Sequence, residues 1–166
     1  GDVYKRQGLS PDTFRFFTFE PIAVTFGRLQ RASDINFENC KKYGIDVVRR
    51  PTGGRAVFHC GDLTYSFMIS EKNQLLGGSP LQTFEKLSLA FAEGFKLLNI
   101  ECELSKGKLK YRGLRACFGA PSRFELTVKG KKILGSAQFR EKGFILQQGV
   151  IPVIKPHISP HIVIKE

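Results

Sequence analysis

The chain has 166 residues, of which 42% are hydrophobic and 25% are charged, and its formal net charge at pH 7 is +11. This balance is typical of one soluble globular domain with its own core, and no apolar run is long enough for a membrane-spanning helix, which excludes that class of membrane protein. The four cysteines show no paired short spacing, which disfavours a zinc site or a disulfide framework and favours a reducing compartment, the cytoplasm.

The N-terminal part of the chain predicts two strands and a short helix. Residues 13–20 alternate between polar and aromatic types and residues 22–26 are an apolar run, so we expect these two segments to form an antiparallel pair. Ser33 or Asp34 is a candidate N-cap for the helix, and Gly44 is well placed to end it.

A glycine-bearing turn over residues 51–54 lies between predicted strands over residues 45–50 and 63–69. Glycine tolerates a positive φ and lets a ligand approach the main chain. Backbone N–H groups beside guanidinium groups suit a carboxylate or a phosphate, which favours a binding loop. The flanking arginines are Arg49, Arg50 and Arg55. A plain hairpin is the alternative, and a P-loop is excluded because no Gly-Lys-Ser or Gly-Lys-Thr follows.

The clearest helix begins with Ser79, a candidate N-cap, and Pro80 at the first helical position, and it ends at Asn99. Apolar residues recur along it at intervals of three and four, so one broad face is expected to pack on a sheet. These residues are Leu81, Phe84, Leu87, Leu89, Phe91, Ala92, Phe95 and Leu98.

Beyond the helix, a short strand is expected through residues 102–104. Residues 124–128, 132–139 and 144–153 then predict a three-stranded meander. The predicted fold class is α/β, of the α+β kind, with a mixed, largely antiparallel sheet flanked by helices.

Two further features concern partners and metals. Between residues 105 and 142 the chain has eleven basic residues and two acidic ones, a local net charge of +9, so we expect one basic face that attracts an acidic partner. His157 and His161 are four residues apart, but Pro156 and Pro160 break the helix that would align them. No metal site is therefore predicted.

Three segments carry a resemblance to a known family. They are residues 49–59 (RRPTGGRAVFH) with residues 63–66 behind them, residues 130–138 (GKKILGSAQ), and Ala116-Cys117-Phe118 ahead of Pro121-Ser122. Over about residues 14–150 the chain resembles the lipoate–protein ligase and octanoyltransferase superfamily. The place of the cysteine resembles the nucleophile of the cysteine-dependent octanoyltransferases of the LipM type, a residue that ATP-dependent lipoate ligases do not use.

This resemblance implies the biotin and lipoate ligase-like catalytic fold. We expect a single catalytic domain over residues 9–166, truncated relative to the family at its opening helix and after the meander. Residues 1–8 are expected to be a leader or an artefact outside the family pattern.

The reaction implied is transfer of an octanoyl group from octanoyl-acyl carrier protein to a lysine of a lipoyl domain or of the H protein of the glycine cleavage system. Cys117 is the implied nucleophile, and Lys132 is the implied lysine of the pocket. The implied substrate-binding residues are Arg50, Thr52, Gly53, Gly54, Arg55, His59, Gly135, Ser136 and Ala137. No cofactor, metal, membrane or nucleic acid is implied. ATP and Mg²⁺ belong only to the alternative, an ATP-dependent lipoate or octanoate ligase.

The residue types suit this chemistry. A thiolate forms a reversible thioester, and nearby basic residues favour the thiolate of Cys117. Lys132 could shuttle the proton of the incoming amine, and backbone N–H groups of the glycine turn could stabilise the oxyanion. The apolar residues expected to line a slot for a C8 chain are Val57, Phe58, Phe67 and Leu134.

A purely structural role remains an open alternative at three positions. Cys117 could be a buried structural thiol, Lys132 a solvated hairpin lysine, and His59 a core histidine. A basic module that binds nucleic acid is a further alternative, disfavoured because the chain has no RNA-binding signature.

Overall fold

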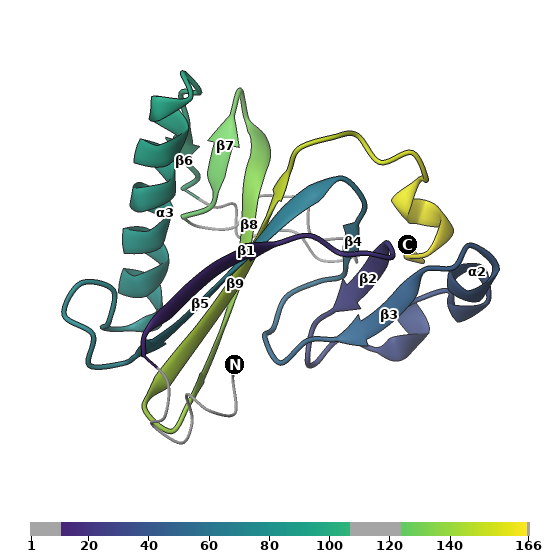
Figure 1. Cartoon of the computed structure of the whole chain (residues 1–166), viewed down its shortest axis with the longest axis horizontal. Helices are drawn as coiled ribbons and strands as arrows, with labels where there is room; N and C mark the ends of the chain where they lie inside the picture. The colour runs from purple at the N-terminus through teal and green to yellow at the C-terminus, as the bar shows by residue number, and fades with distance from the viewer. Residues whose placement is uncertain (1–10, 107–123, 166) are drawn as a thin grey trace.

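The strands form two separate sheets, which Figure 1 shows side by side. The computed structural model describes residues 11–106 and 124–165. The larger sheet is antiparallel throughout, in the order β1-β5-β9-β8-β7-β6. Its strands are β1 (Thr13–Phe17), β5 (Asp62–Ser70), β6 (Glu103–Leu104), β7 (Leu126–Val128), β8 (Lys131–Glu141) and β9 (Phe144–Pro152).

The smaller sheet has the order β3-β2-β4. Its central strand β2 (Ala23–Phe26) pairs in parallel with β3 (Asp46–Arg49) and antiparallel with β4 (Val57–His59). The predicted α+β class and the meander of β7, β8 and β9 are confirmed, whereas the division into two sheets was not foreseen.

The predicted pairing of the first two strands is wrong. β1 and β2 do not pair, because β1 lies at the edge of the large sheet beside β5. The hairpin that was the alternative for the glycine turn is not formed either, because β3 lies in the small sheet and β5, the strand expected over residues 63–69, lies in the large one. Hydrophobic alternation marks a strand but does not identify its partner.

Helix α2 (Phe37–Lys42) begins two or three residues later than predicted. Its N-cap is Asn36, whose side chain accepts a hydrogen bond from the N–H of Asn39 at 3.1 Å. The predicted cap residues instead lie in a short 3-10 helix, η1 (Ala32–Asp34). Gly44 follows the helix with a φ of +63°, which favours glycine, as expected for a residue that ends a helix.

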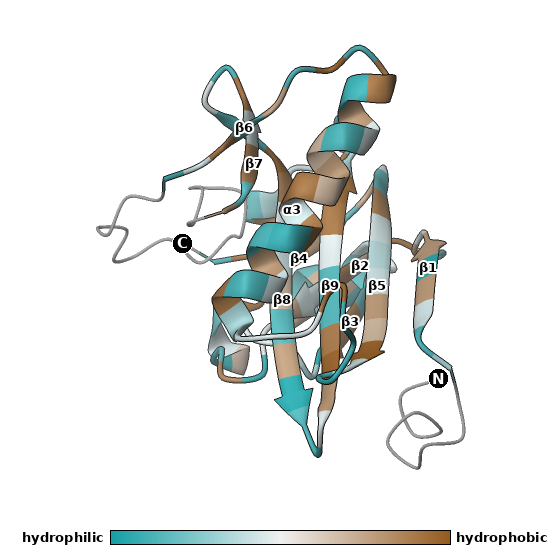
Figure 2. Ribbon diagram, turned by 90° about the vertical axis from the view of Figure 1, so that its left-hand side faces the viewer, coloured by the Kyte–Doolittle hydropathy of each residue, from teal (hydrophilic) through white to brown (hydrophobic). Residues whose placement is uncertain are grey.

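Helix α3 (Pro80–Leu97) has the predicted cap, in which Ser79 and Gln82 form a reciprocal capping box. It lies across one face of the large sheet (Figure 2) and packs there through Leu87, Phe91 and Phe95. The buried face is narrower than predicted, since Leu81, Leu89 and Leu98 are 56%, 49% and 68% exposed. Within residues 11–106 and 124–165, no helix has the length and hydropathy needed to cross a membrane.

A second core fills the outer face of the small sheet. It joins residues of β2 and β4 to α2 and to the segment that follows the short helix η3 (Pro160–Ile162). Figure 1 shows this C-terminal segment beside α2 and β2, and a bridge between Ile35 and Ile164 connects them. Each sheet therefore has its own core on its outer side, which leaves the two inner faces to form a site.

Gly149→Ala is expected to lower the free energy of unfolding by about 1–3 kcal/mol, the usual cost of overpacking a core. A Cβ atom at Gly149 would lie 2.2 Å from the ring of Tyr65, which is fully buried. Gly94→Ala in α3 is the matched control, because a Cβ atom there meets nothing within 4 Å. Urea denaturation should show a loss for Gly149→Ala alone, and equal stability of the two variants would contradict this packing.

Candidate active site

A cavity of about 240 Å³ lies between the inner faces of the two sheets. Its walls are mostly apolar, with a few polar groups where the glycine turn meets β8 and β9. The large sheet contributes Arg15, Phe17, Thr64, residues 135–137 and residues 148–150, and the small sheet with its turn contributes Thr25, Val48, Arg49, Arg50, Pro51, Gly54, Val57 and His59. A concave, largely apolar space with few polar groups is typical of a small-molecule site.

Arg50 is hydrogen-bonded to the glycine turn and to strand β2. Its Nη2 donates to the carbonyl oxygens of Gly53 at 2.9 Å and Arg55 at 2.6 Å, and its Nη1 donates to the carbonyl oxygen and Oγ1 of Thr25 at 3.0 and 3.2 Å. A trans peptide places its N–H opposite its C=O, so the N–H of Gly54 points away from this guanidinium. The φ of Gly54 is +87°, a backbone conformation that glycine adopts at little cost and that other residues rarely adopt. The turn is therefore held in one orientation.

Arg49 is also engaged with the main chain. Its Nη1 donates to the carbonyl oxygens of Gly27, Arg28 and Gln30 at 2.8–3.2 Å, and its guanidinium lies 4.1 Å from the ring centroid of Phe26. Arg49 and Arg50 thus have a structural role in addition to bordering the cavity, and the binding of an anion by these arginines stays a prediction.

His59 belongs to a buried hydrogen-bond chain. Its Nδ1 lies 2.9 Å from Oδ2 of Asp62, and its Nε2 lies 2.9 Å from Oγ1 of Thr25. Because Thr25 accepts a bond from Arg50, its hydroxyl is free to donate to Nε2, and Nδ1–H then donates to Asp62. Thr64 donates to the same carboxylate at 3.0 Å. The chain links the strand ends of β4 and β5 to the glycine turn.

Tyr65 is hydrogen-bonded to Ser136, a residue of the cavity wall. Its phenol oxygen lies 2.5 Å from Oγ of Ser136, and burial raises the pKa of Tyr65 to about 12, although the hydrogen bond with Ser136 acts in the opposite direction. The phenol is therefore protonated at neutral pH. Oγ1 of Thr52 donates to Oε1 of Gln148 at 3.3 Å, which connects the glycine turn to β9.

The predicted catalytic pair is only partly within the described residues. Cys117 lies outside them. Lys132, at the start of β8, forms an ion pair with Glu125 in which Nζ and Oε1 are 2.8 Å apart, and the two side chains are only 3% and 7% exposed. Lys132 is thus not a solvated hairpin lysine, which was the alternative to a catalytic role. Its part in catalysis stays a prediction.

The predicted substrate-binding residues fall into two groups. Arg50, Gly54 and His59, together with residues 135–137, border the cavity. The others stand in the turn behind it and do not border it: Thr52, Gly53 and Arg55. Their roles in binding stay predictions.

Of the apolar residues expected to line a C8 slot, Val57 alone borders this cavity. Phe67 and Leu134 pack in the core under α3, and Phe58 packs in the core of the small sheet. Sequence reasoning also missed Thr25 and Asp62, because only the pairing of β2 with β4 brings Thr25 to the imidazole.

Among the other cysteines, Cys60 lies beside a histidine, with its Sγ 3.3 Å from Nδ1 of His157. Burial raises the pKa of the thiols of Cys40 and Cys102, as is typical of inert structural cysteines. In the part of the chain that the structure describes, no group of three His, Cys, Asp or Glu side chains is arranged to hold a metal ion.

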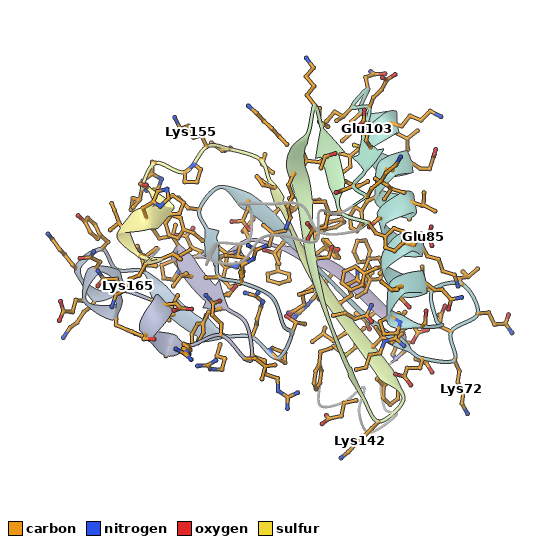
Figure 3. All side chains as sticks on the ribbon, turned by 180° about the vertical axis from the view of Figure 1, so that it is seen from behind. Lys72, Glu85, Glu103, Lys142, Lys155 and Lys165 are labelled. Atoms are coloured by element: carbon orange, nitrogen blue, oxygen red, sulfur yellow. The ribbon has the colours of Figure 1, made fainter. Side chains whose placement is uncertain are left out.

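The expected basic face is not visible among the described residues of the segment from 105 to 142. Lys129 and Lys131 lie at one end of the long strand β8, and Lys142 lies beyond its other end, where Figure 3 labels it. Lys132 and Arg140 are engaged in ion pairs with Glu125 and Glu71. These charges are therefore spread along the strand.

Comparison with protein families gives one match that spans most of the chain. The family described as lipoyl protein ligase A/B catalytic domain matches residues 3–154. Among curated proteins, the chain is 41% identical over 153 residues to "Octanoyltransferase LipM" of Brevibacillus brevis and 43% identical over 146 residues to that of Carboxydothermus hydrogenoformans. Each alignment covers 87% of this chain and 55% or 54% of the relative, so the chain spans about half the length of these proteins.

Solved structures agree on the fold. Protein Ta0514 of T. acidophilum superposes with a TM-score of 0.71 at 25% identity, covering 88% of this chain and 57% of that one. Lipoate-protein ligase A bound with ATP gives a TM-score of 0.72 at 24% identity, covering 94% and 60%.

Proposed function

The chain belongs to the lipoyl protein ligase A/B catalytic domain family, and from this premise we propose that it transfers an octanoyl group from octanoyl-acyl carrier protein to a lysine of a lipoyl-carrier domain. The acyl group passes through a thioester on Cys117. The acceptor is a lipoyl domain or the H protein of the glycine cleavage system, the reaction takes place in the cytoplasm, and it needs no cofactor.

The observation that carries this proposal is the mostly apolar cavity between the two sheets, closed at one side by the glycine turn that Arg50 braces. A C8 chain needs an apolar slot, because each methylene group removed from water contributes about 0.8 kcal/mol. The thioester carbonyl needs hydrogen-bond donors, and the N–H of Gly54 points away from the guanidinium of Arg50. The curated relatives named octanoyltransferase add support.

The proposed chemistry has two steps. In the first, the thiolate of Cys117 attacks the carbonyl carbon of the octanoyl thioester, the bond to the carrier sulfur breaks, and the carrier thiolate takes a proton from the ammonium of Lys132. In the second, the amine of the target lysine attacks the thioester on Cys117, an amide forms, and the thiolate leaves. Lys132, neutral after the first step, takes the proton that the amine loses and is again the ammonium that pairs with Glu125.

The test is intact-mass spectrometry after mixing the protein with octanoyl-acyl carrier protein. We expect the wild-type protein to gain one octanoyl group, hydroxylamine to remove it, and Cys117→Ser to lack it. Cys102→Ser is the matched control and should still be acylated, since burial raises the pKa of the Cys102 thiol. Absence of the adduct on the wild-type protein, or an adduct that survives Cys117→Ser, would refute the thioester route.

The ATP-dependent ligase is the second candidate, favoured by the fold shared with a ligase that was solved with ATP. It predicts that octanoate or lipoate is attached to the acceptor only when ATP and Mg²⁺ are present, and that Cys117→Ser remains active. One assay with and without ATP separates the two candidates.

A further inference from the structure

A second apolar cavity lies directly behind the first. Its volume is about 250 Å³, and it lies between β4, the end of β9 and the C-terminal segment. Its apolar lining comes from Ala56, Phe58, Pro152, Ile154 and Ile164. The carboxylate of Asp62 also borders it, but this group is already engaged by His59 and Thr64. A space of this kind suits a hydrocarbon chain better than a polar ligand.

Two residues separate the cavities. Val57 and Val150 border both of them, and each is only 7% exposed. Val57 lies on β4 beside His59, and Val150 lies on β9 opposite Gly135 of β8 and Thr64 of β5. The two valines, called the valine wall below, come from different sheets, so they close the first cavity at the boundary between the sheets.

We propose that the valine wall sets the length of the acyl chain that the protein accepts, and that the second cavity is an extension for longer chains that the wall keeps closed. This inference rests on the proposed function. The second cavity is about as large as the first, so removing the wall would give space for several more methylene groups. Each methylene group that enters it should raise the affinity about fourfold.

The test compares the affinities of octanoate and dodecanoate for wild-type protein and for Val57→Ala/Val150→Ala, measured by isothermal titration calorimetry. The wild-type protein should bind dodecanoate no more tightly than octanoate. The double variant should shift the ratio of the two affinities toward dodecanoate by about tenfold or more, the gain from two or more buried methylene groups. Adding Ala56→Leu to the double variant narrows the second cavity and should reduce the shift, because Ala56 is buried and borders that cavity but not the first.

A third variant keeps the proposal testable if the alanine variants do not fold. Val150→Ile adds one methylene group to the valine wall and should shift the preference from octanoate toward hexanoate. An unchanged chain-length profile in a folded variant would overturn the proposal, and so would wild-type protein that binds neither acid. If these affinities behave as expected while no adduct forms on Cys117, the proposed transfer reaction fails and the valine wall stands.

Discussion

Lys132→Met is expected to slow transfer from the acyl-enzyme to the lysine amine by about 10²–10⁴-fold, the usual contribution of a general acid–base group. The same change should lower the free energy of unfolding by about 3–5 kcal/mol, the typical effect of removing one partner of a buried ion pair. The physical reason is the 2.8 Å contact between Nζ of Lys132 and the carboxylate of Glu125, whose side chain is only 7% exposed. Methionine has a similar length but cannot neutralise that carboxylate.

The two effects can be separated with a second variant. In Lys132→Met/Glu125→Leu both charges are absent, and an apolar pair of similar volume should recover most of the stability without recovering transfer. Lys131→Met is the matched control, because Lys131 is the exposed neighbour on the same strand and should change neither property. Stability is measured by urea denaturation, and transfer by single-turnover mass spectrometry. If the double variant regained transfer, Lys132 would act only as a structural residue.

The hairpin that positions Lys132 could be predicted from the sequence, but its contact with Glu125 could not. Lys129 and Gly130 form a two-residue turn between β7 and β8, so Thr127 pairs with Lys132. Glu125 precedes β7, and the pairing of the two strands shifts register between Leu126 and Thr127, which no local pattern indicates. Local patterns did predict the meander and the capped start of α3.

The site itself depends on contacts that local patterns do not contain. Thr25, Arg50 and His59 meet because β2 lies between β3 and β4, and this order is not written in the apolar alternation of any of the three strands. β4 is three residues long and β2 is buried over its whole length, so neither shows the alternation that distinguishes an inner face from an outer one. The sequence therefore indicates the glycine turn and His59 as parts of a site, but it does not indicate that Thr25 connects them.

Arg50→Ala is the second large effect that we expect, with transfer slowed by about 10²–10³-fold, as for the loss of an oxyanion-hole donor. The free energy of unfolding should fall by about 1.5–3 kcal/mol, the value of a hydrogen bond to a charged group in a partly buried setting. The carbonyl oxygens of Gly53 and Arg55 would lose the guanidinium that orients them, and the N–H of Gly54 would lose its fixed direction. Thr25 would lose the donor that leaves its hydroxyl free for His59.

Arg50→Lys distinguishes geometry from charge. A lysine keeps the positive charge but lacks the planar fork that reaches two carbonyl oxygens on one side and Thr25 on the other, so it should restore little of the transfer rate. Arg28→Ala is the matched control, because Arg28 is an exposed arginine just beyond β2 whose guanidinium lies over the ring of Phe139. Initial rates at saturating octanoyl-acyl carrier protein give the comparison. Full activity of Arg50→Lys would mean that the site needs only a positive charge near the acyl carbonyl, and the oriented turn would then have no part in catalysis.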